Sequence, residues 1–459
     1  MAWPVLVSRA LHTLYGMADT AWVGRLSAEA LGAVSTCFFA SWTLLAVGDT
    51  IIAGLTALVS QAIGAHEDEE GTAYAATGAV LAVALGALVA AIGWFGARPL
   101  FELLFDDPEV VRMGAEYLSI YSLLAPLFYL DFAAESVFRA CGDARTPMNV
   151  LLVGTGLNLV LDPLMIFGIG PFPALEVRGA ALATAISQVV VVAIYAGLHL
   201  RRAFPLPVKL SAALRAGTAE RAGRMMRIGL PSALVGVLFS VVYLALARIT
   251  GAFGATALAA LGVVNRLESL NYLTAVAVGM GVSTLVGQNL GAGRADRAEQ
   301  SAHRGALLIS ISTGILTVAF LAWPEAIARL FTNEPAAVRE AVLFLRIVAV
   351  SQVFMGWELV YGQAFTGAGD TLPPMYVSVS MSVIRVPLAW WLSFQTDLGA
   401  AGIWWTISLT GIVRGVWLTA WFRLEHWKRK GAFRTRPAPT PATAAAATPA
   451  IAPEGPEGG

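Results

Sequence analysis

Residues 54–65 read GLTALVSQAIGA, and residues 281–292 read GVSTLVGQNLGA. The two stretches lie 227 positions apart, and the same offset superposes other landmark residues without a gap. A constant offset held over about 150 residues indicates that the second half of the chain is a copy of the first. Other pairs at this offset are Pro4 and Pro231, Pro108 and Pro335, Gly142 and Gly369, and Asp143 and Asp370.

The composition places both halves in a membrane. The chain has 459 residues, of which 57% are hydrophobic and 13% are charged, whereas soluble proteins carry about 25% charged residues. A core of this length cannot cover so much apolar surface, so the bilayer must act as the solvent. The formal net charge of zero argues against nucleic acid as a partner. The two cysteines, Cys37 and Cys141, have neither disulfide nor metal-binding spacing.

Twelve apolar runs are long enough to span a bilayer, which takes roughly 20 residues of helix. We therefore expect an all-α membrane protein with twelve transmembrane helices in two six-helix repeats. Because six is an even number, both repeats share one orientation, and the pseudo-two-fold axis between them lies along the membrane normal. The runs are 3–23, 34–63, 72–96, 114–137, 147–168 and 178–200 in the first half, and 229–250, 257–289, 304–323, 340–363, 374–395 and 399–422 in the second.

These runs divide the chain into two lobes that we expect to enclose a central cleft. The N-lobe covers 1–200, a cytoplasmic connector covers 201–227, and the C-lobe covers 228–424. Arginine and lysine are concentrated in the connector and directly after the last run, which predicts that both termini are cytoplasmic. The remaining residues, 425–459, become rich in proline, alanine and threonine, and we expect them to form a disordered cytoplasmic tail.

Ionisable side chains inside apolar spans are costly and are functional candidates for that reason. The first half has four such polar candidates in its first, fifth and sixth spans, namely Asp19, Asn158, Asp162 and Thr184. Two carboxylates, an amide oxygen and a hydroxyl form a set of hard oxygen ligands, which suits a proton or Na⁺ and no transition metal. The alternative for Asp19 is that it faces water at the outer end of its helix.

The repeat provides an internal control for these candidates. In the second half Leu246 stands in place of Asp19, Arg385 in place of Asn158, and Ala389 in place of Asp162. The fold therefore does not need the polar groups, which favours a functional role for them in the first half. Three charged residues of the second half, Glu268, Glu358 and Arg385, are candidates for a C-lobe ionic network, either as a structural pairing of buried charges or as a part of transport.

Several motifs taken together resemble the multidrug and toxic compound extrusion (MATE) family. The chain carries Leu-Tyr-x-x-x-Asp-Thr-x-Trp-Val-Gly at 14–24, Val-Ser-Gln-x-Ile-Gly at 59–64 and Arg-Ala-x-Gly-Asp-x-x-Thr-Pro at 139–147. Asn-Leu-Val-Leu-Asp-Pro at 158–163 and Gly-Ala-Ala-Leu-Ala-Thr at 179–184 are similar to its DinF-like branch. The resemblance implies an antiporter of the bacterial or archaeal cytoplasmic (inner) membrane that expels lipophilic, often cationic compounds in exchange for H⁺ or Na⁺.

The resemblance also assigns roles to residues. The coupling site of that branch maps to Asp19, Asn158, Asp162 and Thr184, and a first-helix proline whose bend accompanies protonation maps to Pro4. Tyr15, Trp22 and Gln188 are candidates for lining the substrate cavity. We expect no cofactor apart from the coupling ion, small-molecule substrates and the lipid bilayer as partners, and a monomer.

Other classes fit the sequence less well. A lipid-linked sugar flippase of the same superfamily, or another lipid flippase, would share the repeats, but few spans here contain the arginine or lysine that binding a pyrophosphate needs. The NorM-like branch carries acids on the seventh and tenth helices, where this chain keeps only Glu358. An enzyme would need a phosphate-binding loop, a nucleophile elbow or a zinc motif, and the sequence contains none of them.

Overall fold

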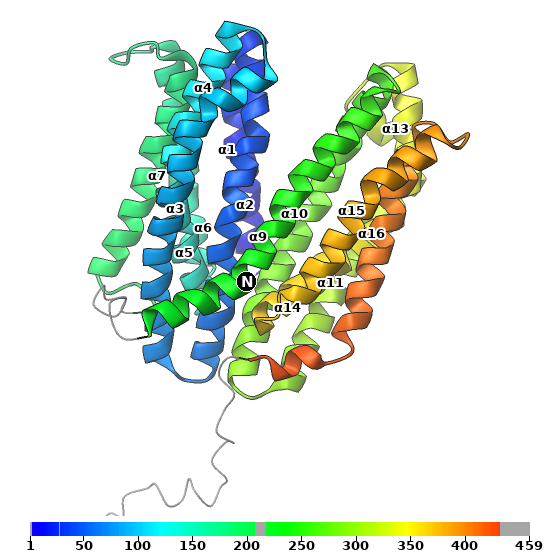
Figure 1. Cartoon of the computed structure of the whole chain (residues 1–459). Helices are drawn as coiled ribbons and strands as arrows, with labels where there is room; N and C mark the ends of the chain where they lie inside the picture. The colour runs from blue at the N-terminus through cyan, green and yellow to red at the C-terminus, as the bar shows by residue number, and fades with distance from the viewer. Residues whose placement is uncertain (1, 27, 207–216, 432–459) are drawn as a thin grey trace, which may run out of the picture.

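The computed structural model describes residues 2–26, 28–206 and 217–431, and within them the side chains of residues 2, 12–13, 15–20, 28–36 and 38–40 are not described. The described chain folds into helices joined by short turns. Two groups of long helices stand side by side, and their ribbons diverge toward one end of the molecule (Figure 1). We call the opposite end, at which α2 and α10 finish, the base. The expectation of an all-α fold is confirmed.

The N-lobe is built from the first seven helices. Their apolar composition allows them to lie in a bilayer, and turn-forming residues separate them: Pro108 opens α4 behind the capping carboxylate of Asp107, and Gly168 ends α6 with a left-handed φ of 69°. The helices are α1 (Ala2–Val23), α2 (Ala28–Gly64), α3 (Asp68–Leu104), α4 (Pro108–Leu123), α5 (Ala125–Ala140), α6 (Arg145–Phe167) and α7 (Glu176–Leu200).

The C-lobe repeats this order. Gly369 closes a helix with a φ of 76°, as Gly142 with a φ of 94° follows the equivalent helix of the N-lobe, so the expected turn role of both glycines is confirmed. The helices are α9 (Thr218–Gly251), α10 (Ala255–Gly291), α11 (Ala295–Ala322), α12 (Pro324–Arg329), α13 (Pro335–Val348), α14 (Ser351–Ala368), α15 (Leu372–Phe394) and α16 (Ala401–Phe422), followed by the 3₁₀ helix η1 (His426–Arg429).

The fourth span of each lobe is broken at the same place. The pair α4 and α5 bends by 43°, and the pair α13 and α14 bends by 55°. Pro126 follows the first break, whereas Val353 occupies the equivalent position at the second, so the break does not depend on proline. In the described residues eight helices are long and apolar enough to span a membrane, or ten when each bent pair is one span. With α1 and α16, each lobe has six spanning helices.

The lobes meet at the base through two equivalent contacts. A side chain on Gly64 would place its Cβ 1.9 Å from the Gln288 carbonyl oxygen, and one on Gly291 would come equally close to that of Gln61. Gln61 Nε2 donates to the Gly367 carbonyl at 2.9 Å, and Gln288 Nε2 donates to that of Ala140 at 2.8 Å. Each contact maps onto the other at the repeat offset, as a two-fold axis between the lobes requires.

The sequence alone suggests that Gly64 and Gly291 are turn and cap residues. Each does end its helix, but neither adopts a positive φ. Their lack of a side chain serves instead to let the α2 and α10 backbones approach closely. We refer to the four residues Gln61, Gly64, Gln288 and Gly291 as the base contact.

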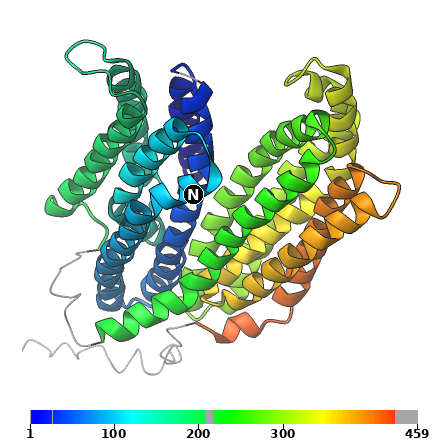
Figure 2. The same ribbon diagram turned by 45° about the horizontal axis from the view of Figure 1, so that its top comes forward.

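The first helix of the C-lobe starts on the N-lobe. α9 begins at Thr218, so the prediction of a connector over 201–227 is wrong for its last part. The start of α9 runs beneath the N-lobe before the helix rises (Figure 2). There Arg221 forms an ion pair with Glu70 of α3 at 2.8 Å. A Cβ on Gly229 would lie 2.0 Å from the Thr50 carbonyl oxygen of α2, so backbones touch there as well.

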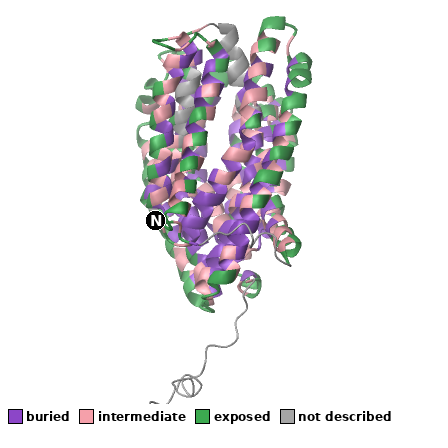
Figure 3. Ribbon diagram, turned by 90° about the vertical axis from the view of Figure 1, so that its left-hand side faces the viewer, coloured by how far each residue is buried: buried purple, intermediate pink, exposed green. Residues whose placement is uncertain are grey.

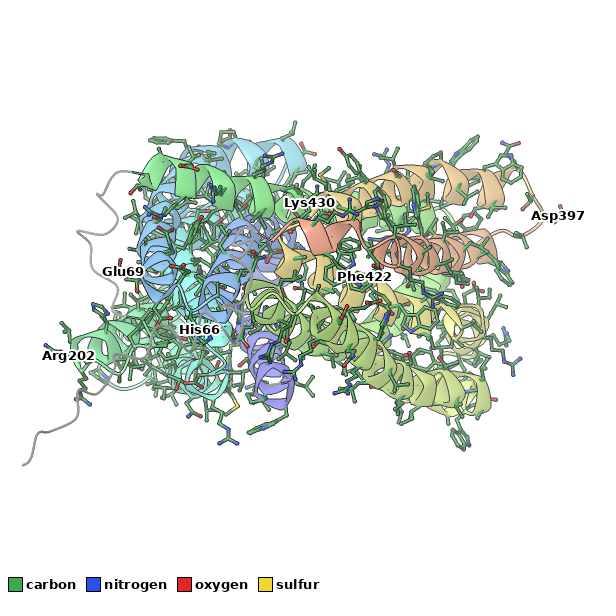
Figure 4. All side chains as sticks on the ribbon, turned by 90° about the horizontal axis from the view of Figure 1, so that it is seen from below. His66, Glu69, Arg202, Asp397, Phe422 and Lys430 are labelled. Atoms are coloured by element: carbon green, nitrogen blue, oxygen red, sulfur yellow. The ribbon has the colours of Figure 1, made fainter. Side chains whose placement is uncertain are left out.

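The beginning of the tail is ordered against the C-lobe. Trp427 of η1 is 1% exposed and stacks on Phe422 with ring centroids 4.5 Å apart. Lys430 Nζ lies 3.3 Å from the Asp370 carboxylate, and in the view from below both Lys430 and Phe422 lie at this end of the molecule (Figure 4). The prediction of disorder from residue 425 is therefore wrong up to Lys430, and residues 432–459 lie outside the described part of the chain.

Buried residues are concentrated toward the base, whereas many residues on the outer faces of the helices are exposed (Figure 3). The exposed side chains on the long helices include large apolar ones such as Phe95, Ile315 and Leu307. Such a surface is unfavourable in water and is expected where lipid covers it. The lobes are packed tightly at the base, and α9 continues this close packing along α2, where a Cβ on Gly236 would lie 2.9 Å from the Ala46 side chain.

Candidate functional site

The strongest candidate site in the described residues is a polar pair on α6. Asn158 and Asp162 are both 0% exposed although they lie in an apolar helix. Their spacing of four residues places them on one face of the helix, and Asn158 Nδ2 donates to Asp162 Oδ1 at 2.9 Å. The pair predicted from spacing is therefore formed. Pro163 follows within the same helix, which leaves the carbonyl of Leu159 without its usual helical donor.

The remaining candidates of this site lie on the two helices that flank α6. Thr184 is 0% exposed on α7, which packs closely on α6, since a Cβ on Gly179 would lie 2.5 Å from the Met165 carbonyl oxygen. α1 lies along α6 and carries Asp19 and Tyr15. The side chains of Asp19 and Tyr15 lie outside the described residues, so their place in the site stays a prediction.

Two of the residues predicted to line the substrate cavity are described. Trp22 is half-buried near the end of α1, where it meets Phe167 of α6 edge-on at 6.2 Å and Arg25 lies 4.6 Å from its ring centre. Gln188 of α7 is 6% exposed, and its Nε2 donates to Asp131 Oδ2 of α5 at 3.3 Å. Gln188 therefore forms a hydrogen bond with the buried carboxylate of Asp131.

The same region of the C-lobe is apolar. Leu246 and Ala389, which replace Asp19 and Asp162, are both 0% exposed and belong to one hydrophobic cluster. Beyond α15, equivalent residues of the two lobes are 223 instead of 227 positions apart. The equivalent close contacts of Gly402 with Leu392 and of Gly179 with Met165 show this change. At that offset Thr184 corresponds to Ile407, which is a member of the same cluster. The second lobe thus fills with packed hydrocarbon three of the positions that are polar in the first, while the position of Asn158 is taken by the buried Arg385.

The three charged residues predicted to form a C-lobe ionic network have other partners. In the described residues no ion pair joins Glu268, Glu358 and Arg385 to one another. Glu268 Oε1 accepts from Gln352 Nε2 at 2.6 Å, and Arg385 Nε donates to Thr410 Oγ1 at 2.8 Å.

Glu358 instead forms an ion pair with Arg414 of α16 at 2.6 Å. Sequence reasoning missed Arg414, although a lone arginine within the apolar run 399–422 was a signal that could have identified it. It also missed the buried pair of Glu135 and Arg139, which lie one turn apart on α5. No group of three or more His, Cys, Asp or Glu side chains that could hold a metal ion occurs in the described part of the chain.

The two equivalent prolines both lie within the described parts of their helices. Pro231 lies inside α9, where its missing N–H interrupts the backbone hydrogen bonds. Pro4 lies near the start of the described part of α1, and its assignment as a hinge stays a prediction.

A family model described as MatE matches the chain twice, over residues 4–164 and 231–391. The chain belongs to the MATE family of transporters. The two matched segments are offset by 227 residues, which is the offset of the internal repeat. The match does not distinguish branches within the family, so the DinF-like assignment stays a prediction.

Relatives and solved structures agree with the MATE assignment over nearly the whole chain. The chain is 28% identical to the probable multidrug resistance protein NorM of Thermotoga maritima, over 94% of its own length and 92% of that protein. It is 25% identical to a protein of Shewanella oneidensis named FAD transporter, over 91% of each chain. A crystal structure of a MATE transporter in a bent conformation superposes with a TM-score of 0.87 at 22% identity, over 94% of this chain and 96% of that one.

Proposed function

We propose that this MATE protein is an antiporter that expels lipophilic or cationic compounds in exchange for H⁺ or Na⁺. The observation that carries the proposal is the buried pair of Asn158 and Asp162. A carboxylate inside a membrane span is costly unless a proton or a cation neutralises it, so such a group favours binding of a coupling ion. The probable multidrug resistance proteins among its relatives support the choice of cargo.

The equivalent positions in the C-lobe support the choice of residues for the coupling site. The positions equivalent to Asp19, Asp162 and Thr184 come together in one apolar cluster of the C-lobe. Because the lobes share one fold, the three polar residues are expected to converge in the same way in the N-lobe. A carboxylate, an amide oxygen and a hydroxyl in one shell can hold a proton or coordinate Na⁺.

Transport would follow by alternating access. The lobes touch tightly at the base, so the cargo would leave from the opposite end, and rotation of the lobes about the base would expose the other side. The exchange requires that the coupling ion and the cargo stabilise different states or compete for one cavity. The positively charged residues near the base support an orientation with the base and both termini on the cytoplasmic side of the inner membrane.

The proposal is tested by uptake of a fluorescent cationic dye into inverted membrane vesicles under an imposed pH or Na⁺ gradient. Wild-type protein should accumulate dye with one of the two gradients, which also identifies the coupling ion. Asp162→Asn should reduce uptake to the level of vesicles without the protein, because the neutral amide keeps the shape but cannot bind the ion.

Asp397→Asn is the matched control. It makes the same chemical change in the exposed turn between α15 and α16, at the outer edge of the C-lobe in the view from below (Figure 4). This variant should transport normally. Gradient-driven uptake by Asp162→Asn at the wild-type level would refute the coupling role of Asp162.

An anionic cargo is the second candidate, because the interior of the C-lobe contains two guanidinium groups. Arg385 is 4% exposed and forms no ion pair with any described residue within the usual 4 Å, while Arg414 is neutralised by Glu358. A buried arginine of this kind can bind a carboxylate or a phosphate. The relative named FAD transporter, and the flippase alternative with its pyrophosphate cargo, both fit this reading.

Transport of FAD and of the cationic dye by one preparation separates the two candidates. If the cargo is anionic, wild-type vesicles should take up FAD, and Arg385→Gln should lose FAD uptake. If Arg385→Gln lowers the transport of neither compound, Arg385 has a structural role and the anionic candidate is dropped.

A further inference from the structure

The C-lobe contains a polar cavity that the transport site does not include. It has a volume of about 220 Å³ and lies between α11, α14 and α16 in the half of the lobe nearest the base. Its lining residues include His303, Ser310, Trp357, Tyr361 and Arg423. These side chains bring a guanidinium, hydroxyl groups and aromatic rings together around a single small volume.

The cavity opens on the face of the lobe that lipid covers. Leu307, which is one of its lining residues, is 64% exposed. Farther along α11 the same kind of surface continues with Ile311 at 58% and Ile315 at 68% exposed. On the side of the base the apolar surface gives way to Lys428 and Arg429 of η1. The cavity therefore lies at the level where acyl chains end and headgroups begin.

The polar groups of the cavity are held in place by one another. Trp357 Nε1 donates to Ser310 Oγ at 2.7 Å, and His303 Nδ1 lies 3.0 Å from the Tyr361 hydroxyl. Arg423 is exposed and forms no ion pair with a described residue, so its five N–H donors are available to a ligand. A guanidinium beside hydroxyl and imidazole groups is suited to a phosphate, which it can bind through two parallel hydrogen bonds.

The repeat shows that the fold does not require these polar residues. At the offset of 227 their N-lobe counterparts on α3 and α5 are all apolar, with Ala76 for His303, Val83 for Ser310, Leu130 for Trp357 and Ala134 for Tyr361. The same helix packing is thus achieved in the N-lobe with hydrocarbon alone. Polar side chains gathered at a lipid-facing level in only one lobe point to a ligand of that lobe.

We propose that this cavity binds the headgroup phosphate of an anionic phospholipid. Arg423 contacts the phosphate. Ser310, which bonds Ala306 and Trp357, and His303, which bonds Tyr361 and Glu299, form the wall of the cavity beside it. The acyl chains lie along the exposed leucine and isoleucine side chains of α11. Basic pockets between membrane helices on the cytoplasmic side are suited to such headgroups, and this site is separate from the transported cargo.

Native mass spectrometry of the purified full-length protein tests the proposal. The protein is titrated with phosphatidylglycerol, with phosphatidylcholine of the same chain length, and with inorganic phosphate. We expect one tightly held phosphatidylglycerol per wild-type chain. Arg423→Gln should weaken its binding about tenfold, as loss of one charged hydrogen-bond donor predicts. Leu307→Trp should weaken it as well, by narrowing the mouth of the cavity.

Arg429→Gln is the matched control, because Arg429 is an exposed arginine of η1 that does not line the cavity. It should bind phosphatidylglycerol like the wild type. Equal binding by wild type, Arg423→Gln and Leu307→Trp would overturn the proposal. Binding of inorganic phosphate without any preference for phosphatidylglycerol over phosphatidylcholine would identify a free-phosphate site and would also overturn it.

Discussion

The two lobes share one backbone plan but place different chemistry inside it. In the N-lobe the acid Asp131 of the bent span accepts a hydrogen bond from an amide, that of Gln188. In the C-lobe the equivalent acid Glu358 is paired with the guanidinium of Arg414. Conversely, the position of the buried Asp162 is taken by Ala389 in an apolar cluster.

This difference separates the features that maintain the helix bundle from those that are candidates for a role in transport. The features that recur in both lobes, namely the broken fourth span and the base contact, are architectural. The features that occur in one lobe only are not needed for the fold. The polar pair on α6 is one of these, so the repeat itself supplies a control that a single-copy protein lacks.

The largest effect is expected when the pair of Asn158 and Asp162 is introduced at the equivalent positions of the C-lobe. The double variant Arg385→Asn/Ala389→Asp places a carboxylate at a position that is 0% exposed among apolar side chains. Burial of such a group costs several kcal/mol, of order 3–5. We expect a large fall in the yield of folded protein and in its melting temperature in detergent. Normal folding would mean that the C-lobe can also hold a coupling site.

A second test compares the two residues that interact with the equivalent acids Asp131 and Glu358. Arg414→Leu leaves Glu358 without a cationic partner and should cost about 3–5 kcal/mol. Gln188→Leu removes a neutral donor from Asp131 and should cost only about 1–3 kcal/mol. Denaturation monitored by tryptophan fluorescence measures both. If the additional change Glu358→Gln does not restore stability to Arg414→Leu, the pairing is not the cause.

The base contact offers a test of the symmetry itself. Gln61→Met and Gln288→Met each remove one hydrogen bond across the lobes while keeping a side chain of similar length. Each should cost about 1 kcal/mol, with the larger loss for Gln61→Met, because Gln61 is 1% exposed whereas Gln288 is partly buried. Accessibility of cysteines introduced near the base should rise in both variants. A loss of stability in only one variant would show that the two contacts are not equivalent in energy.

The smallest change is expected at the first proline. Pro4→Ala changes a single backbone N–H near the start of the described part of α1 and should alter the melting temperature little. Pro231→Ala restores a hydrogen-bond donor inside α9 and should have the larger effect. The hinge hypothesis adds that Pro4→Ala lowers transport while substrate binding persists. Equal and mild effects of both variants on transport would refute the hinge.

The repeat made the lobes and their helix order predictable, because the offset fixes both halves at once. The breaks at Leu124 and Val350 were not predictable, since the apolar run continues through each of them. The start of α9 was missed for the opposite reason. It is a charged stretch, and such a stretch between two apolar runs indicates a connector rather than a spanning helix.

The site was predictable as far as it is local. Asn158 and Asp162 are one helical turn apart, so spacing alone places them together. Partners on other helices, such as Arg414 for Glu358, depend on how the helices are turned against each other. The partners of Gln61 and Gln288 are backbone carbonyls, which carry no sequence signal at all.

The overlap of α9 with the N-lobe has a consequence for how the chain is made. The ribosome completes the first six spans before Arg221, Met225 and Gly229 emerge, yet these residues cover Glu70, Gly54 and Thr50 of the N-lobe. The first repeat therefore enters the membrane with an uncovered groove along α2. That groove is covered only after the start of the second repeat has been synthesised. The packing of the N-lobe is therefore completed by the half of the chain that is made last.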